Sequence, residues 1–248
     1  MHLGEPIQKG NTAGIYLHDG KIIKVLNDNL RDTEAEYEAN KQKYAYSRGL
    51  PVPYVYGVVP VNGRQAIVME HITGRTVGDM LYEDMTKAHE YMNISVDVQL
   101  KIHAVHAADF ERMTDKLERQ LLSARFINDK QKKTLIERMY AIQHENHLCH
   151  GDYHIFNLIL NDHQVTIIDW VDASSGDLRA DVYRSYLLYV QFSQDFADLY
   201  LRLYCETSGI SQDEIFVWAP VIAGARLSEN ISPEEANLLL DIVNHDPK

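Results

Sequence analysis

Apolar and polar residues alternate with the short period of β-strands through about the first 70 residues of the chain. Asp19-Gly20 separates two such runs, and this pair readily adopts the positive φ angles of a type I′ hairpin turn. Val61-Asn62-Gly63 separates another two runs. The pattern predicts a small antiparallel sheet with strands over residues 15–18, 21–26, 52–59 and 65–70.

From residue 76 onward, apolar residues recur at intervals of three and four, which is typical of helices. One earlier helix is expected over residues 32–46, between the predicted hairpins. The later helical regions are residues 76–146, 180–208 and 233–243. Since the pattern changes after residues 70–74, we expect an α+β fold of two lobes, a sheet lobe over residues 1–72 and a mostly helical lobe over 73–248.

Within the second lobe, an acid, an amide and a second acid are spaced around a third predicted hairpin. Asp152 and Asn157 precede two apolar runs, residues 158–160 and 165–168, and Asp169 follows them, so the hairpin brings Asp169 back beside Asn157. A carboxylate such as Asp152 accepts the proton of a substrate hydroxyl, whereas the oxygens of Asn157 and Asp169 suit Mg²⁺ ions that bridge nucleotide phosphates. The pattern therefore predicts the catalytic loop of a phosphotransferase.

The same residues resemble the signature of a known family. His150-Gly151-Asp152-Tyr153-His154-Ile155-Phe156-Asn157 and Ile168-Asp169-Trp170 resemble the H-G-D-x-H-x-x-N and I-D-W motifs of the aminoglycoside phosphotransferase and choline kinase-like family. Residues 176–181 stand where this family has G-D-P-x-x-D, with Leu178 in place of the proline, a departure that affects a turn and not the chemistry. The resemblance implies a protein-kinase-like fold with the nucleotide between the lobes, and a catalytic loop supported by His150, His154 and Asp181.

The resemblance also implies a lysine on a strand of the first lobe that binds nucleotide phosphates and pairs with a glutamate of the next helix. Lys24, flanked by apolar residues, stands at that position. Glu34, Glu36 and Glu38 are the candidate partners, and the usual distance of the family's glutamate from a Gly-Leu-Pro-Val-Pro segment, here residues 49–53, favours Glu38.

Further nucleotide contacts are assigned by position within the kinase-like fold. A small-residue loop over residues 9–14, with Gly10 and Gly14, stands where that fold covers the phosphates. Met69, Glu70 and Ile72 stand in the hinge, where backbone groups bind the adenine edge. Because backbone recognition leaves little mark on side chains, ATP and GTP remain equal candidates.

The charge of the chain is −12, and most of it lies in the second lobe, where residues 150–248 hold 16 acidic and 5 basic residues. A negative field attracts a cationic ligand and repels nucleic acid, although solubility explains the same charge. Glu229 and Glu234-Glu235 are candidate contacts for an amine. The sequence therefore favours a cationic small molecule and no nucleic acid as partner.

The sequence has neither a signal peptide pattern at Met1 nor an apolar run of about 18 residues, so we expect a cytoplasmic protein with no membrane partner. Cys149 and Cys205 cannot form a disulfide scaffold, and Cys149 is expected to be a buried thiol. A zinc site built on the two histidine pairs of residues 103–106 and 150–154 is disfavoured, since the second pair lies in a loop.

Together these features predict a Mg²⁺-dependent enzyme, with two metal ions, that moves the γ-phosphoryl group of ATP or GTP to a hydroxyl of a small molecule. An aminoglycoside-type antibiotic is the first candidate acceptor, which would make antibiotic resistance the role. A metabolite kinase of the choline, homoserine or methylthioribose type and a nucleotide-binding regulatory pseudoenzyme are the alternatives. A protein kinase is disfavoured because Asp169-Trp170 runs into Gly176 without an activation segment.

Overall fold

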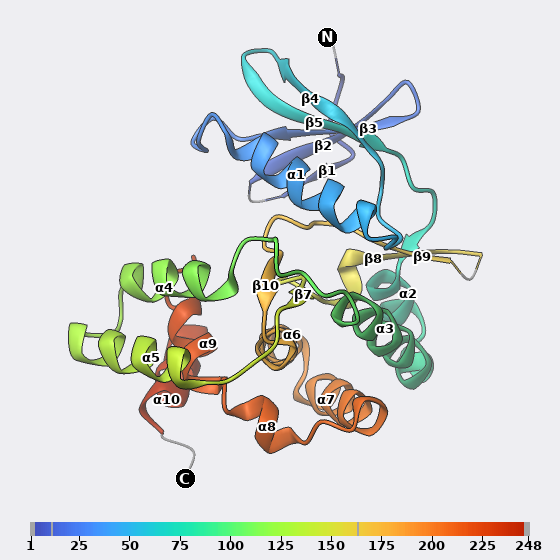
Figure 1. Ribbon diagram of the computed structural model, residues 1–248. Coiled ribbons are helices and arrows are strands. Elements are labelled where there is room, and N and C mark those ends of the chain that lie inside the picture. Colours follow the sequence, from blue (N-terminus) through green and yellow to red (C-terminus); the bar gives the residue numbers. More distant parts are fainter. Residues whose placement is uncertain (1–2, 11, 163, 246–248) are drawn as a thin grey trace. The chain divides into compact units, whose positions relative to one another are not determined.

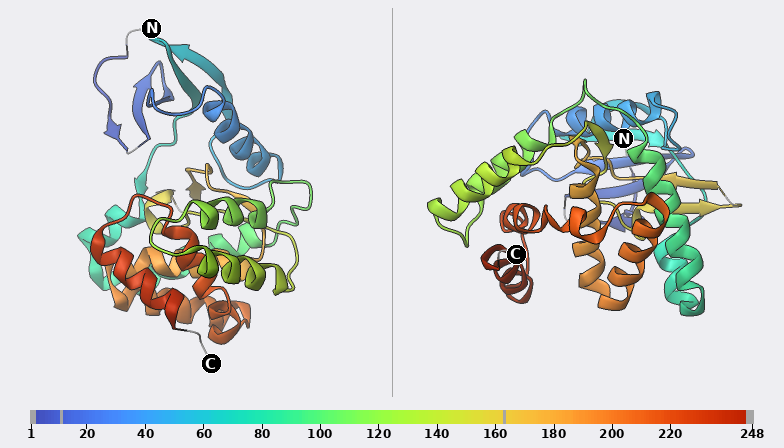
Figure 2. Two further views of the ribbon diagram at one scale, coloured as in Figure 1. Left: turned by 90° about the vertical axis from the view of Figure 1, so that its left-hand side faces the viewer. Right: turned by 60° about the horizontal axis from the view of Figure 1, so that its bottom comes forward.

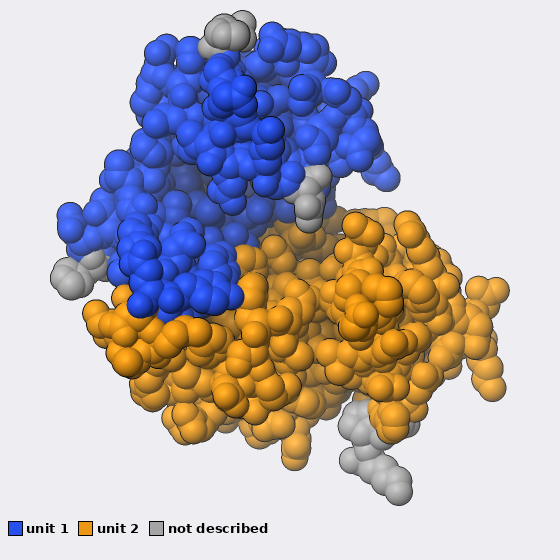
Figure 3. All heavy atoms as spheres, turned by 180° about the vertical axis from the view of Figure 1, so that it is seen from behind, with its two compact units in different colours: residues 1–83, 155–171 blue, residues 84–154, 172–248 orange. Residues whose placement is uncertain are grey.

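The computed structural model describes residues 3–10, 12–162 and 164–245 and divides into two compact units. Residues 1–83 and 155–171 form the first unit, and residues 84–154 and 172–248 form the second (Figure 3). Within the described residues, no helix is both long and apolar enough to cross a membrane.

The first unit contains a five-stranded antiparallel sheet with the strand order β1-β2-β3-β5-β4 (Figure 1). Asp19 and Gly20 both have positive φ angles, 49° and 71°, which confirms the turn predicted between the first two long strands. The predicted strand over 52–59 begins and ends later than expected. The elements are β1 (Gln8–Lys9), β2 (Ala13–His18), β3 (Lys21–Leu26), helix α1 (Glu34–Ser47), β4 (Val55–Val61) and β5 (Arg64–Glu70).

Helix α1 packs on one face of this sheet, as Figure 1 shows. Strand residues point alternately to the two faces, and the two faces accordingly carry separate buried clusters. Leu26 and Ile22 pack with Ala35 and Ala39 of the helix, whereas residues such as Ile23 belong to the cluster on the opposite face. Lys24, two residues from both Ile22 and Leu26, therefore belongs to the helix-covered face.

The predicted third hairpin forms and lies in the first unit, because its first strand pairs with β6, so that Arg75 is opposite Leu160. Ile167 N also donates to Pro51 O at 2.8 Å. The observed division thus differs from the expected boundary at residue 72. The predicted turn includes His163, which lies outside the described residues. The elements are β6 (Arg75–Thr76), α2 (Val77–Glu83), the 3-10 turn η2 (Ile155–Asn157), β8 (Leu158–Asn161) and β9 (Gln164–Ile167).

The second unit is helical apart from a two-stranded pairing of β7 with β10. The helical region predicted over 180–208 breaks at Ser193 into α6 and α7, which lie side by side (Figure 2). The elements are the 3-10 turn η1 (Met85–Lys87), α3 (Ala88–His103), α4 (Met113–Ser123), α5 (Asp129–Ala141), β7 (His147–Cys149), β10 (Ser174–Gly176), α6 (Leu178–Phe192), α7 (Gln194–Ser208), α8 (Gln212–Phe216), α9 (Ala219–Arg226) and α10 (Pro233–Asn244).

Candidate active site

The first unit holds a buried lysine between two carboxylates. Lys24 Nζ donates to Glu38 Oε1 at 2.6 Å and to Asp169 Oδ1 at 3.1 Å. Glu38 is therefore the glutamate that reaches Lys24, whereas Glu36 is exposed. Burial lowers the pKa of Lys24, but the charges of Asp169 and Glu38 raise it more, so that it lies above its ordinary value. The ammonium is consequently charged at neutral pH.

Asp169 follows strand β9 in an unusual backbone conformation. Its φ angle of 64° lies in the left-handed region, which is uncommon for a residue other than glycine. Ile168 N donates to Asn157 O at 3.0 Å, so the hairpin returns the chain beside Asn157 as the sequence predicted. Asn157 is buried, while the Asp169 side chain is 39% exposed and can take a ligand in addition to Lys24.

The remaining first-unit residues of the predicted nucleotide site lie on or beside the sheet. Gly10 N donates to Ala13 O at 2.9 Å, and Gly14 lies on β2; Asn11 of the same predicted loop is outside the described residues. Met69 and Glu70 end β5, and Ile72 follows it.

The part of the predicted catalytic loop that lies in the second unit, residues 150–154, has a tight backbone that requires glycine at position 151. Gly151 has a φ angle of 81°, and a Cβ atom there would lie 2.3 Å from Asp172 O. The ring of His150 is buried, and its Nδ1 accepts a hydrogen bond from Asp152 N at 3.3 Å. His150 therefore contacts the backbone of the loop.

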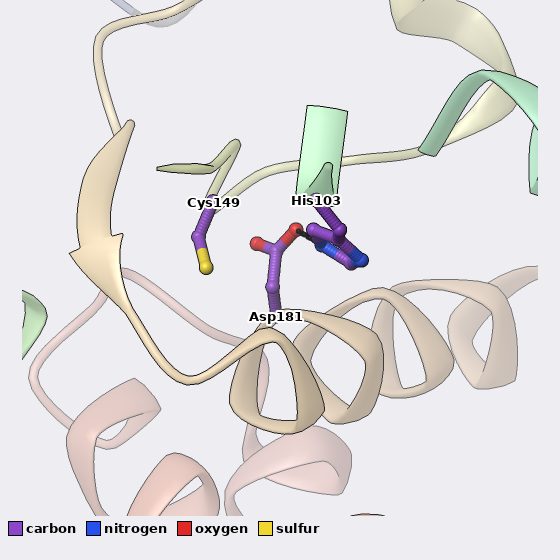
Figure 4. Close-up of side chains that lie close together, drawn as sticks. All are labelled: His103, Cys149 and Asp181. Atoms are coloured by element: carbon purple, nitrogen blue, oxygen red, sulfur yellow. Dashed lines mark hydrogen bonds and ion pairs between the residues drawn. The ribbon is translucent and has the colours of Figure 1, made fainter. Parts of the chain in front are cut away.

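Asp181 holds this loop from helix α6. Its carboxylate accepts hydrogen bonds from Gly151 N at 2.7 Å and His150 N at 3.3 Å. His103 Nε2 lies 3.0 Å from the same carboxylate (Figure 4). The other ring nitrogen of His103 lies 2.8 Å from Tyr204 Oη. One buried carboxylate thus fixes two successive backbone N–H groups immediately before Asp152.

Cys149 lies near this carboxylate, as Figure 4 shows, and the described side chains of His103, Cys149 and Asp181 are close enough together to share a metal ion. Cys149 is buried, as predicted, and burial raises the pKa of its thiol, which the nearby Asp181 charge raises further. A metal needs the thiolate. Because that form is disfavoured and the Asp181 oxygens already accept hydrogen bonds, the cluster fits loop support better than metal binding.

The carboxylate of Asp152 lies between two basic side chains. Arg184 Nη2 is 3.5 Å from its Oδ1, and His154 Nε2 is 3.7 Å from its Oδ2. Burial raises the pKa of Asp152, but His154, Arg184 and His150 lower it more, so that it lies well below its ordinary value. Asp152 is therefore ionised at neutral pH and able to accept a hydrogen bond from a hydroxyl.

Sequence reasoning missed Arg184 and a second basic residue, Lys116, at this site. Lys116 Nζ donates to the backbone and side-chain oxygens of Asp172, both at 2.6 Å. One feature of the sequence could have indicated Arg184: it follows Asp181 by three residues, so both side chains lie on the same side of helix α6. No feature of the sequence could have indicated Lys116, because it lies 56 residues from its partner Asp172.

Comparison with solved structures shows the fold. An aminoglycoside-3′-phosphotransferase of type VIII is 16% identical and has a TM-score of 0.63, with 90% of each chain covered. A candidate fructosamine-3-kinase from Haemophilus somnus 129PT is 14% identical, with a TM-score of 0.69 and 97% of this chain and 89% of that chain covered. A thermostable mutant of aminoglycoside phosphotransferase APH(4)-Ia, in ternary complex with ADP and hygromycin B, is 13% identical, with a TM-score of 0.66 and coverages of 96% and 88%.

These similarities confirm the predicted protein-kinase-like fold with a sheet lobe and a helical lobe. Among curated proteins, none matches the sequence at a significant level. The sequence matches the Phosphotransferase enzyme family over residues 5–219, which include the lysine, the glutamate, the catalytic loop and the metal-ligand candidates. The chain therefore belongs to this phosphotransferase family, the family that its catalytic-loop motif resembles.

Proposed function

We propose that this protein transfers the γ-phosphoryl group of ATP or GTP to a hydroxyl of a small molecule. The observation that carries the proposal is the buried Lys24 ammonium, held at 2.6 Å by Glu38 and at 3.1 Å by Asp169. Kinases of this fold need such a lysine–glutamate pair beside a metal-binding aspartate. In this protein Glu38 is the glutamate of that pair, and Asp169, which has a φ angle of 64°, is the aspartate beside it.

In this proposal the first unit binds the nucleotide. Lys24 contacts the phosphates, and the backbone near Gly10, Gly14, Met69, Glu70 and Ile72 surrounds the nucleotide. Backbone groups of this kind bind phosphates and base edges without charged side chains.

Asn157 and Asp169 would hold Mg²⁺, and their amide and carboxylate oxygens are the hard donors that this ion prefers, so the donor set fits. Bound Mg²⁺ neutralises charge on the β- and γ-phosphates during transfer. Asp169 also contacts Lys24, so both cations would act on the same phosphates. Two ions, as the family resemblance implies, remain part of the proposal.

The second unit supplies Asp152. Its carboxylate accepts the acceptor hydroxyl's proton as the new O–P bond forms to the γ-phosphorus and the bond to the β-γ bridging oxygen breaks, which releases ADP or GDP. Asp181 and His150 hold the loop backbone, and His154 and Arg184 keep the carboxylate ionised. Positioning and charge neutralisation account for most of the rate in such a reaction.

The test is the variant Asp152→Ala, measured by ADP release over a panel of hydroxylated small molecules. General-base removal lowers turnover by about 10²–10⁴-fold. Mg²⁺-nucleotide affinity, measured by calorimetry, stays within about twofold, because the side chain serves the acceptor. Asp195→Ala, an exposed aspartate of the same unit, is the matched control. Equal losses of nucleotide affinity and turnover would reject the role of Asp152.

A further inference from the structure

Helix α1 carries a second buried lysine, Lys41, which takes no part in the proposed phosphoryl transfer. Lys41 is only 3% exposed, although lysine is among the residues that are least often buried. Its Nζ donates to the backbone oxygen of Val171 at 2.9 Å and lies 4.2 Å from the centre of the Tyr37 ring. All three residues belong to the first unit, so these contacts lie within one compact body.

The carbonyl group that Lys41 holds lies two residues after Asp169, the proposed metal ligand. Asp169 has a φ angle of 64°, and a residue other than glycine adopts this left-handed conformation at a cost of about 1–2 kcal/mol. Such a conformation persists only where the surrounding structure fixes it. The backbone next to Asp169 therefore has to be held in place.

Hydrogen bonds hold the chain on both sides of Asp169. Immediately before it, Ile168 N donates to Asn157 O at 3.0 Å. Two residues after it, Lys41 Nζ holds Val171 O. The peptide groups that set the direction of the Asp169 side chain therefore lie between two anchored positions.

Helix α1 reaches Asp169 by two routes. Glu38 holds Lys24, and Lys24 in turn donates to Asp169 Oδ1 at 3.1 Å. Lys41 follows Glu38 by three residues, so both side chains lie on the same side of the helix. One face of α1 thus supports the carboxylate of Asp169 through Lys24 and the backbone of Asp169 through Val171 O.

We propose that Lys41 is a positioning residue for the metal site, which holds Val171 O and thereby keeps Asp169 in the conformation from which its carboxylate binds Mg²⁺. The inference rests on the proposed function and adds to it a residue that contacts neither the nucleotide nor the metal. Methionine has a side chain of similar length and no charge to desolvate, so it would serve packing alone as well as lysine does. The variant Lys41→Met therefore separates the two roles.

The first experiment measures how much Mg²⁺ strengthens the binding of ATP and GTP, by calorimetry with Mg²⁺ and with EDTA. In Lys41→Met this strengthening should fall about tenfold, the lower end of the effects seen when a group that orients a metal ligand is removed. The affinity in EDTA should change less than about twofold, because Lys24 and Glu38 remain in place. Lys43→Met, which removes an exposed lysine of the same helix, is the matched control and should change neither value.

The direction of this effect distinguishes positioning from charge. Loss of a positive charge near the site would by itself strengthen the binding of a cation. An unchanged or larger effect of Mg²⁺ in Lys41→Met would therefore overturn the inference. The melting temperature should change by less than about 3 °C, since methionine preserves the packing. A larger fall with an unchanged effect of Mg²⁺ would show a structural role alone.

The second experiment needs no ligand. Amide hydrogen exchange followed by mass spectrometry should show that peptides containing the Ile168 amide exchange at least about threefold faster in Lys41→Met than in the wild-type protein, because the segment opens more often. Peptides from α5, in the second unit, should exchange at the same rate in both proteins. Equal exchange at Ile168 would overturn the inference.

Two further provisions keep the test decisive. Should Lys41→Met not fold, Lys41→Gln, which keeps a polar head group on a side chain one atom shorter, is measured in its place with the same expected results. Failure of the proposed function has a different signature, the absence of Mg²⁺-dependent ATP and GTP binding by the wild-type protein. If the wild-type protein shows that binding and the Lys41 variant shows it unchanged, the inference alone is wrong.

Discussion

Replacement of Glu38 by alanine is expected to destabilise the protein through the charge that it leaves behind on Lys24. The side chains of Lys24 and Glu38 are only 11% and 5% exposed, so the pair is well buried. Removing one member of a buried ion pair costs about 3–5 kcal/mol. Lys24 keeps Asp169 at 3.1 Å, but that carboxylate is 39% exposed and compensates only part of the loss. We therefore expect the free energy of unfolding to fall by about 2–3 kcal/mol.

Urea unfolding followed by tryptophan fluorescence and far-UV circular dichroism measures this change. Trp170 in the first unit and Trp218 in the second are both fully buried, so each reports on its own unit. Glu36→Ala, on the same helix at an exposed position, is the matched control and should cost less than about 1 kcal/mol.

A double-mutant cycle separates charge from packing. If the loss in Glu38→Ala comes from an uncompensated ammonium, adding Lys24→Met should return most of the lost free energy, because an apolar side chain then fills the site. The reasoning is refuted if Glu38→Ala costs no more than Glu36→Ala, or if Lys24→Met makes the Glu38→Ala protein still less stable.

Four further outcomes are expected. Asp169→Ala should weaken ATP or GTP binding in the presence of Mg²⁺ and remove most of its Mg²⁺ dependence, and calorimetry with an unchanged metal dependence would reject Asp169 as a ligand. Gly151→Ala should lower the free energy of unfolding by more than about 2 kcal/mol in urea titrations, since its φ is 81° and the new Cβ would meet Asp172 O; a near-neutral effect would contradict this geometry. The pKa of Asp152 is lower in the folded protein than in the unfolded chain, where an aspartate has a pKa of about 4. The ionised carboxylate therefore stabilises the fold above about pH 4, and this stabilisation is lost as the pH falls further. For the same reason, kcat/KM should show no decline from protonation of Asp152 between about pH 5 and 8. Arg184→Gln should move the acidic limb of the plot of kcat/KM against pH to higher pH. An unchanged limb would argue against Arg184 as a cause of the depressed pKa of Asp152.

Features that depend on residues close together in the sequence could be predicted from the sequence. The hairpin at Asp19-Gly20 follows from the turn preference of that pair, and the helix-covered face of β3 follows from the alternation of strand side chains. The order of Asp152, Asn157 and Asp169 around a hairpin was sufficient to predict the reaction class. Boundaries were less accurate, as the start of β4 and the break at Ser193 show, because tertiary packing decides where an element ends.

Only the tertiary structure decided which charges meet. Glu38 reaches Lys24 because α1 lies on the face of β3 that carries the lysine, and Asp169 reaches it across 145 residues of sequence. Near Asp152, the folded chain pairs Asp172 with Lys116 and Glu229 with Arg184 and Arg226, contacts that the net charge of the sequence could not indicate. Net charge is a sum over the sequence, but ligand recognition depends on the few groups within hydrogen-bonding distance, and packing alone brings those groups together.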